Sequence, residues 1–266
     1  MDYATVARRL EAKQADCSLH LSTTSMSVAG GVATYSGRDG YANRACAIGL
    51  DGPVTSADVE RLIHFFESRG EEAKVELSPF AHESLVAALG TYGFVVRHFV
   101  NALVLPLGPR SVAELAIESP PEVVIERLER SDEGVVRAFA QANERAFAAE
   151  GSPVSQMALD LVIKATMVPT NDSFIARTRE GRIVGVASSE SSDGLTLLFG
   201  GAVIPSYRRR GLQRALMITR LAYGILRGSD LACVCTPPGR ETERNAARLG
   251  FSMAYTRVAL RRPLSR

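Results

Sequence analysis

Apolar residues recur along this chain with two different periods, and the switching between them predicts a mixed α and β fold. In 55–70 the apolar residues lie three or four positions apart, which is the spacing of one helix face. Thr55 or Ser56 is expected to cap this helix, and Gly70 is expected to end it. In 73–78 apolar and polar residues alternate instead, which is typical of a half-buried strand.

The same two periods assign most of the chain to helices and strands. Helices are expected at 2–15, 55–70, 81–90, 131–150 with Ser131 as its cap, 155–167, 212–227 and 241–250. Strands are expected at 26–37, 43–50, 73–78, 93–107, 122–128, 173–190 as a hairpin turning at Glu180-Gly181, 194–204, 231–236 and 251–264.

A proline-rich stretch, 106–121, divides the chain into two unequal parts. We expect a first domain at 1–108, a linker at 109–121 and a second domain at 122–266. Both parts end with a helix, a Gly-Phe junction and a strand closed by Pro-Leu. This order predicts a diverged duplication, and the alternative is that two α+β segments share it by chance.

Composition limits the classes of protein that this chain can represent. Of its 266 residues 46% are hydrophobic, enough for a sizeable core, and the net charge of +2 is too small for a chain-wide nucleic-acid footprint. No apolar run approaches the ~18 residues of a membrane helix, and the N-terminus lacks the apolar stretch of a secretory signal. The cysteines and histidines have no zinc-site spacing, so we expect no metal, and a reducing cytoplasm is the default location.

The segment "VIPSYRRRGLQRAL", Val203 to Leu216, places three arginines and a glycine immediately before a helix. The first backbone N–H groups of a helix lack partners inside it, and the helix dipole adds partial positive charge there. Gly211 lets an anion approach the backbone, and Arg208, Arg209 and Arg210 supply charge-assisted donors. The pattern predicts a phosphate site, and the alternative is a solvated basic turn.

This segment resembles the acyl-CoA-binding motif of the GNAT superfamily of N-acyltransferases, whose usual form is Gln/Arg-x-x-Gly-x-Gly/Ala between a strand and a helix. Arg208, Gly211 and Gln213 occupy the three signature positions, and Gln213 departs from the usual small residue. "RNAARLGF", 244–251, resembles the second conserved region. The resemblance implies an α+β fold of two GNAT-like domains, each a mixed, mostly antiparallel sheet flanked by helices.

The resemblance also implies which residues bind acetyl-CoA (coenzyme A). Backbone groups of Ala202 and Val203 would hydrogen-bond the pantetheine arm. Asn245 would lie beside the pantetheine or phosphate, with a local cap or a surface polar residue as the alternative. The backbone N–H groups that would hold the pyrophosphate belong to Arg209, Arg210, Gly211, Leu212, Gln213, Arg214 and Ala215.

The first domain resembles a degenerate copy without a cofactor loop. Its corresponding segment, 50–62, lacks the arginines and carries Asp51 and Asp58, which would repel a phosphate at a helix start. We therefore expect that this half does not bind CoA and that it shapes the acceptor cleft or an interface.

The sequence assigns no catalytic residue. Many GNAT relatives have a glutamate on the strand before the arginine loop, whereas the corresponding residues 198–201 of this chain include no carboxylate. Many also have a tyrosine before the Gly-Phe junction, and Ala246 takes that position here. Tyr207 and Tyr255 are interpreted as packing residues. Glu144 and Glu150 could reach an acceptor cleft, but solvated helix charges are the stronger interpretation. Glu190 is rejected because a turn near Ser192 would pair Phe199 with Gly185, well away from it.

The leading hypothesis is an acetyl-CoA-dependent N-acetyltransferase that moves an acetyl group directly, in a ternary complex, to a primary amine of a small molecule or protein. The backbone N–H of Val203 would polarise the thioester carbonyl. A second hypothesis is a non-catalytic acyl-CoA-binding regulatory protein, and a third is anion or nucleic-acid recognition by the arginine run. Acetyl-CoA and an amine acceptor are the expected partners, without nucleic acid or membrane, and a homodimer is left open.

Overall fold

The computed structural model describes residues 2–108, 119–147 and 153–264, which form two compact units. The first unit contains residues 1–103, 235–244 and 252–266, and the second contains 104–234 and 245–251. Most of the expected linker, 109–118, and Glu150 lie outside the described residues.

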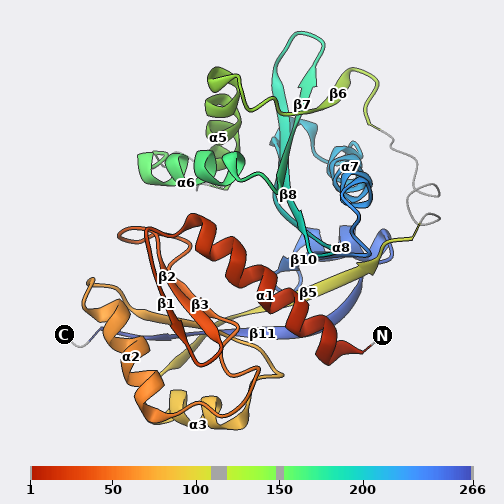
Figure 1. The fold of residues 1–266 in the computed structure, drawn as a ribbon. Coiled ribbons are helices and arrows are strands. Elements are labelled where there is room, and N and C mark those ends of the chain that lie inside the picture. The colour runs from red at the N-terminus through yellow and green to blue at the C-terminus, as the bar shows by residue number, and fades with distance from the viewer. Residues whose placement is uncertain (1, 109–118, 148–152, 265–266) are drawn as a thin grey trace. The chain divides into compact units, whose positions relative to one another are not determined.

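The elements follow the expected order along the chain (Figure 1). The first part of the chain forms α1 (Tyr3–Leu21), β1 (Thr24–Val28), β2 (Gly31–Tyr35), β3 (Arg44–Cys46), α2 (Ser56–Glu67), β4 (Ala73–Leu77), α3 (Glu83–Thr91) and β5 (Val95–Pro106). The second part forms β6 (Val123–Arg127), α5 (Glu133–Phe147), α6 (Gln156–Met167), β7 (Asn171–Thr178), β8 (Ile183–Ser192), β9 (Leu195–Val203), the short 3-10 helix η1 (Pro205–Tyr207), α7 (Leu212–Leu226), β10 (Leu231–Thr236), α8 (Glu241–Arg248) and β11 (Ser252–Arg262).

The C-terminal strand belongs to the first unit, which differs from the expected division of the chain. Strands of the first unit follow the order β1-β2-β3-β4-β11-β5, and β11 pairs antiparallel with β4 from Val258↔Leu77 to Arg262↔Ala73. Pairing with β11 satisfies backbone groups along β4 that would otherwise be exposed at a sheet edge. Local sequence order therefore predicts the succession of elements but not this exchange.

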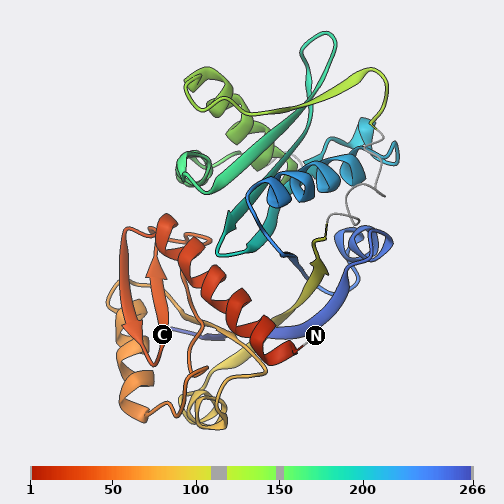
Figure 2. The same ribbon diagram turned by 45° about the vertical axis from the view of Figure 1, so that its right-hand side comes forward.

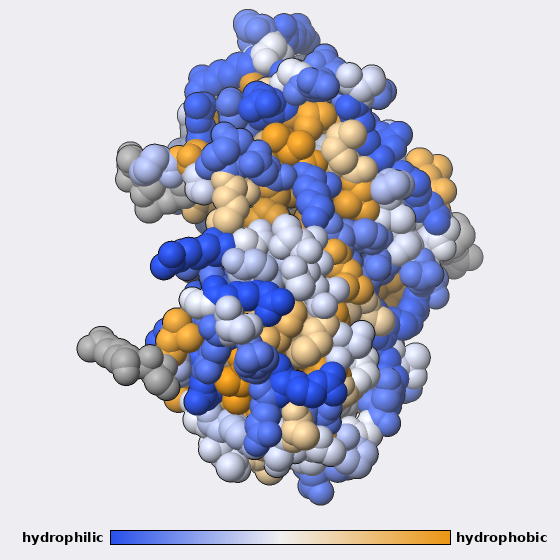
Figure 3. All heavy atoms as spheres, turned by 60° about the vertical axis from the view of Figure 1, so that its left-hand side comes forward, coloured by the Kyte–Doolittle hydropathy of each residue, from blue (hydrophilic) through white to orange (hydrophobic). Residues whose placement is uncertain are grey.

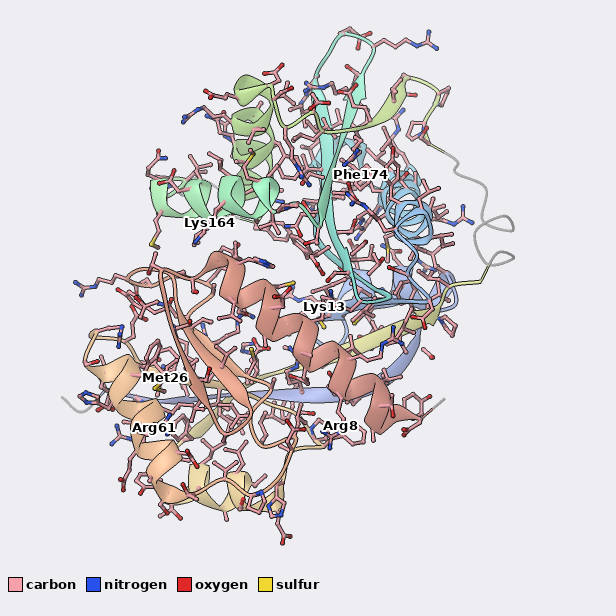
Figure 4. The ribbon with its side chains drawn as sticks, in the orientation of Figure 1. Arg8, Lys13, Met26, Arg61, Lys164 and Phe174 are labelled. Carbon is pink, nitrogen blue, oxygen red and sulfur yellow. The ribbon has the colours of Figure 1, made fainter. Side chains whose placement is uncertain are left out.

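The sheet of the second unit carries helices on both faces. Its strands β10-β9-β8-β7-β6 are covered by α7 on one side and by α5 and α6 on the other (Figures 1 and 2). Successive residues of β7 serve the two faces, because Phe174 packs with Leu212 and Leu216 of α7 whereas Ile175 packs with Phe139 of α5. Figure 4 labels Phe174, whose ring packs edge-on against Tyr223 of α7. This alternation confirms the expected sheet with flanking helices.

Helix starts agree with the sequence at some positions and differ at others. Thr55 caps α2, as expected. In α5 the cap is Asp132 and not Ser131, because the Asp132 carboxylate accepts from the Val135 N–H at 3.0 Å while the Ser131 hydroxyl bonds Glu129. A carboxylate one residue later caps equally well, and periodicity does not distinguish the two positions.

The β8–β9 hairpin turns at Asp193-Gly194, later than the turn near Ser192 that was assumed from the sequence. Ser192 pairs with Leu195, and Ser188 therefore pairs with Phe199, where Gly185 was expected. The residue Asp193 in the turn has φ +50°, and Gly194 has φ +72°, which is the conformation of a two-residue hairpin turn. Glu190 pairs with Leu197 and is buried.

Each unit contains one strand–helix–strand segment with a parallel strand pair, which supports the predicted duplication. In the first unit α2 connects β3 to β4, which pair at Ala45↔Val75. In the second unit α7 connects β9 to β10, which pair from Leu195↔Leu231 to Leu198↔Val234. The sheets are otherwise mostly antiparallel, as expected for the fold class.

The face of the molecule in Figure 3 is mostly polar, with smaller apolar patches between the charged side chains. Among the large apolar side chains that remain exposed are Val96, Phe147 and Leu226, at 55%, 62% and 79%. Such scattered exposure is ordinary for a folded domain and identifies no site by itself.

A buried ion network links the N-terminal helix to the C-terminal strand within the first unit. The Arg257 guanidinium bonds both Glu11 of α1 and Glu76 of β4, and Arg44 bonds Glu76 at 2.7 Å. Burial alone would raise the pKa of Glu76, but the positive charges of Arg44 and Arg257 outweigh burial and lower it to about 2. The ionised carboxylate is therefore part of the folded state at neutral pH.

We predict that Glu76→Gln lowers the free energy of unfolding by about 3 kcal/mol at pH 7, because it leaves Arg44 without its carboxylate partner and the buried Arg257 with Glu11 alone. The folded-state pKa lies below the unfolded value, so the contribution is complete above about pH 5 and is lost as the pH falls toward 2. Denaturant unfolding should therefore show a smaller difference at pH 3 than at pH 7.

Glu72→Gln is the matched control, because Glu72 pairs with Arg261 in a much more exposed ion pair. Its effect should stay within about 1 kcal/mol. Equal effects of the two substitutions at pH 7 would contradict the role of the buried network.

Candidate functional site

The loop between β9 and α7 adopts left-handed backbone at two residues. Arg209 has φ +61° and Gly211 has φ +82°. Gly211 is the N-cap of α7, and it carries no side chain that could accept from the helix N–H groups. The left-handed conformation at the cap explains why glycine stands at this motif position.

The amides at the start of α7 have no protein acceptor in the described chain. Hydrogen bonding inside the helix begins with Ala215, whose N–H donates to the Gly211 carbonyl at 3.0 Å. None of the described backbone carbonyls accepts from the N–H groups of 209–214. The expected cradle of 209–215 is therefore one residue too long, because Ala215 already belongs to the helix ladder, and the shorter set carries the positive end of the helix dipole.

The three arginines have different surroundings. Arg208 donates from Nε to the Val203 carbonyl at 3.1 Å. Arg210 pairs with Glu122 at 2.5 Å and lies over the Tyr207 ring, with 4.9 Å between the guanidinium carbon and the ring centroid. Arg209 is exposed. Each engaged guanidinium uses only part of its five donors, so the loop retains positive charge and donors for an anion.

Gln213, the departure from the usual motif, contacts Asn245. The Asn245 Nδ2 donates to Gln213 Oε1 at 2.9 Å, and Arg248 donates to Asn245 Oδ1 at 3.1 Å. The longer side chain thus bridges α7 and α8 within the second unit. The structure brings together the two residues that the sequence assigned to one site, and it gives Asn245 two protein partners.

Strands β9 and β10 pair only over the first part of β9. Their register ends at Leu198↔Val234, so 199–203 have no β10 partner among the described residues. The Ile204 N–H donates to Val184 of β8, and by alternation the backbone groups of Val203 point away from β8, toward the side without a strand. The Val203 N–H is thus directed to that side, where the Val203 carbonyl accepts from Arg208.

Ala202 differs from Val203, although the sequence assigned the backbone groups of both residues to the pantetheine arm. It pairs with Val186, and its carbonyl lies 3.4 Å from the position that a Cβ on Gly185 would occupy. The backbone of Ala202 therefore faces β8, and by alternation Gly201 and Val203 are the residues that face the side without a strand. The sequence alone does not tell which residues of β9 direct their backbone groups away from β8, because that depends on the register between β8 and β9.

A β-bulge lies in the part of β9 that pairs with β8 but not with β10. Between the pairs Val186↔Ala202 and Ser188↔Phe199, β9 has one residue more than β8, and Gly200 has φ +58°. Two buried polar side chains contact this bulge, Arg220 of α7 and Asn143 of α5. Neither residue is predicted from the sequence, although Arg220 lies four residues after Leu216 on the buried face of α7, where an apolar residue is usual.

The burial of α7 explains why Arg220 was missed. Three- and four-residue spacing from Leu212 leads along one helix face to Leu226, yet Leu226 is 79% exposed. The buried face instead includes Met217, Ile218 and Arg220. Packing against several strands buries a wider face than a single stripe, and this width is not encoded in the period.

The residues at candidate acid and base positions lie in different surroundings. Ala246 is fully buried, and Tyr255 of the first unit donates to Glu11 at 2.7 Å, in agreement with a packing role. Glu144, which follows Asn143 on α5, is half-buried, and burial raises its pKa. Glu144 is thus partly shielded from water.

The corresponding helix of the first unit begins in a different way. At α2 the Thr55 hydroxyl accepts from the Asp58 N–H at 3.2 Å, and the Asp58 carboxylate accepts from the Thr55 N–H at 3.1 Å. This capping box satisfies amides that an anion would need, and it places a negative charge beside them. The two helix starts therefore differ, and the absence of CoA binding in this half stays a prediction.

Comparison with solved structures identifies the fold. A GCN5-related N-acetyltransferase from Kribbella flavida matches with a TM-score of 0.69 at 21% identity, over 98% of this chain and 96% of that one. A putative acetyltransferase from the GNAT family from Novosphingobium aromaticivorans matches with a TM-score of 0.55 at 17% identity, over 93% and 95%. A tandem GNAT protein from the clavulanic acid biosynthesis pathway matches with a TM-score of 0.57 at 14% identity, over 75% and 67%. The chain therefore has the GNAT fold, and that prediction is confirmed.

No protein-family model and no curated protein sequence matches the chain. Within 2–108, 119–147 and 153–264, no helix combines the length and apolarity needed to cross a membrane. The same residues contain no group of three or more acidic, cysteine or histidine side chains arranged for a metal ion.

We predict that the Gln213–Asn245 hydrogen bond contributes about 1 kcal/mol to stability, because both groups are partly shielded from water. A double-mutant cycle with Gln213→Ala and Asn245→Ala, followed by denaturant unfolding, measures this coupling. Arg248→Ala serves as a control for the second partner of Asn245. Additive effects of the two alanine substitutions would show that the side chains do not interact in solution.

Proposed function

We propose that the chain is an acetyl-CoA-dependent N-acetyltransferase that transfers the acetyl group directly to a primary amine. The proposal rests on the start of α7, where amides without protein partners lie behind a left-handed glycine. The solved structures with this fold include proteins described as N-acetyltransferases. Acetyl-CoA supplies the activated acyl group as a thioester, and the chain supplies binding, orientation and polarisation.

The pyrophosphate fits the N–H groups of 209–214. Six consecutive amides without described backbone acceptors, the helix dipole and the charges of Arg209 and Arg214 all favour a doubly charged anion at this position. The side chain of Gln213 is held by Asn245, so the departure from the usual motif residue leaves the backbone amides in place. We assign the phosphate contacts to backbone groups first and to arginine side chains second.

The pantetheine arm fits beside the unpaired part of β9. Amide groups of such an arm can add to 199–203 as a strand would, through Gly201 and Val203. The Val203 N–H would then polarise the acyl carbonyl as negative charge develops on its oxygen. The amine must also lose a proton, and we assign no side chain to that step.

A non-catalytic acyl-CoA-binding protein is the second candidate. It is favoured by Ala246, which is buried at the position where many relatives have a tyrosine, and by the absence of a carboxylate in 198–201. The two candidates share the binding site and differ in turnover.

Incubation of the protein with acetyl-CoA and a panel of small and peptide amines tests the proposal. Free thiol should appear at a rate that depends on both substrates, and the acetylated amine should be detected by mass spectrometry. Tight binding of acetyl-CoA without turnover for any amine would favour the regulatory alternative. No binding of acetyl-CoA would reject both.

We predict that Gly211→Glu lowers the affinity for acetyl-CoA by roughly 100-fold, the effect of two lost charge-assisted hydrogen bonds. The carboxylate would repel the pyrophosphate and take its place at the helix start. Calorimetric titration with acetyl-CoA measures the change, and circular dichroism checks that the fold is retained.

Gly211→Ala is the matched control, because it introduces the same left-handed strain without charge. Its affinity should fall by less than about tenfold. Unchanged affinity in the glutamate variant would exclude the amides of α7 from the binding site.

A further inference from the structure

We propose that Arg220 and Asn143 form a two-sided clamp that holds the β9 bulge in the shape needed to bind the pantetheine arm. This inference rests on the proposed function and concerns two positioning residues of the same site. Arg220 belongs to α7 and Asn143 to α5, and the two helices cover opposite faces of the second unit's sheet (Figures 1 and 2). Both side chains are buried, with 4% and 7% exposure.

Arg220 holds the bulge from the α7 face. Its Nη1 donates to the carbonyls of Ser188 and Phe199, both at 3.2 Å, and its Nε donates to the Leu216 carbonyl of its own helix at 3.0 Å. Ser188 and Phe199 are register partners at the edge of the bulge. One guanidinium nitrogen thus joins β8 and β9 where their ladder is interrupted.

Asn143 holds the next peptide from the α5 face. Its Nδ2 donates to the Gly200 carbonyl at 3.0 Å. Phe199 and Gly200 are consecutive residues, so the clamp fixes two successive carbonyls from opposite sides. That arrangement determines the orientation of the intervening peptide, which a single contact would not do.

The two glycines of the bulge fit the same arrangement. A Cβ on Gly200 would come within 3.1 Å of Asn143 Nδ2, and a Cβ on Gly201 would come within 3.2 Å of Arg220 Nη2. Each glycine therefore makes room for one member of the clamp. In addition, a Cβ on Gly224 would overlap Thr196 of β9, so α7 lies close against β9 one turn after Arg220.

Arg220 is costly to bury, which indicates a role beyond filling the core. None of the described carboxylates pairs with it, and burial lowers its pKa to about 9. The group is still protonated at neutral pH, and its positive charge is stabilised by carbonyl groups alone. An apolar side chain at this position would avoid the cost of desolvation but would leave the Ser188 and Phe199 carbonyls of the bulge without this donor.

The shape of the bulge affects ligand binding because it sets the direction of the backbone groups that follow it in β9. The bulge precedes Gly201 and Val203, whose backbone groups face the side without a strand. A change in the peptide at Gly200 would rotate these groups away from the pantetheine amides. The α7 amides of 209–214 lie beyond the end of β9, so a relaxed bulge leaves the pyrophosphate contacts intact.

The test compares two ligands by calorimetry. Acetyl-CoA contains both the pyrophosphate and the pantetheine arm, whereas 3′-phosphoadenosine 5′-diphosphate contains the pyrophosphate without the arm. Arg220→Met should weaken acetyl-CoA by at least about tenfold, the effect of one misplaced hydrogen bond, and should leave the nucleotide within about twofold. Arg220→Lys, which keeps a charge and donors, should recover part of the loss, and Asn143→Ala should weaken acetyl-CoA selectively.

Met217→Ala is the matched control, because it removes packing from the same helix without removing any of the three Arg220 hydrogen bonds. It should lower the thermal midpoint and leave the ratio of the two affinities unchanged. If Arg220→Met does not fold, Arg220→Lys takes its place, with a smaller but still selective loss.

Equal affinities of the Arg220 variants and the wild-type chain for acetyl-CoA would overturn the clamp, as would equal loss of both ligands. A wild-type chain that binds neither ligand would instead reject the proposed function. Failure of the clamp alone is thus distinguished from failure of the site.

Discussion

Backbone N–H groups at a helix start require acceptors, and the start of α7 does not find them in the described protein. Gly211 adopts a left-handed conformation, which glycine takes without strain, and it offers no capping side chain. The hydrogen bonds that this helix start lacks are those that an anion supplies. The position of α7, the bulge in β9 and the loop arginines all gain their functional meaning from this constraint.

The two units share a strand–helix–strand arrangement but differ at the start of the helix. In the first unit Thr55 and Asp58 satisfy the amides of α2 with their own side chains. In the second unit none of the described backbone carbonyls accepts from the equivalent amides of α7. A duplication that preserves the sheet can therefore lose or keep a binding site through a few residues at one helix start, because the fold depends on the core whereas the site depends on the cap.

Buried charge is handled in two ways in this molecule. In the first unit Arg257 and Arg44 share the carboxylates Glu11 and Glu76, so opposite charges compensate one another. In the second unit the described hydrogen-bond partners of Arg220 are all carbonyl groups. The first arrangement ties together distant parts of the chain, and the second fixes the backbone at an irregular point of a strand, where the proposed ligand contacts begin.

The sequence by itself determined the order of helices and strands, a helix cap at Thr55 or Ser56, the glycine before α7 and the GNAT fold. These features depend on periodicity and on short motifs, which act between near neighbours. Tertiary structure alone decided the pairing of β11 with β4 and the direction of the Val203 backbone groups, which point away from β8 whereas those of Ala202 point toward it. It also decided the Gln213–Asn245 contact and the burial of Arg220. Each of these depends on the register or packing of residues far apart along the chain, and a one-residue shift in register exchanges the two faces of a strand.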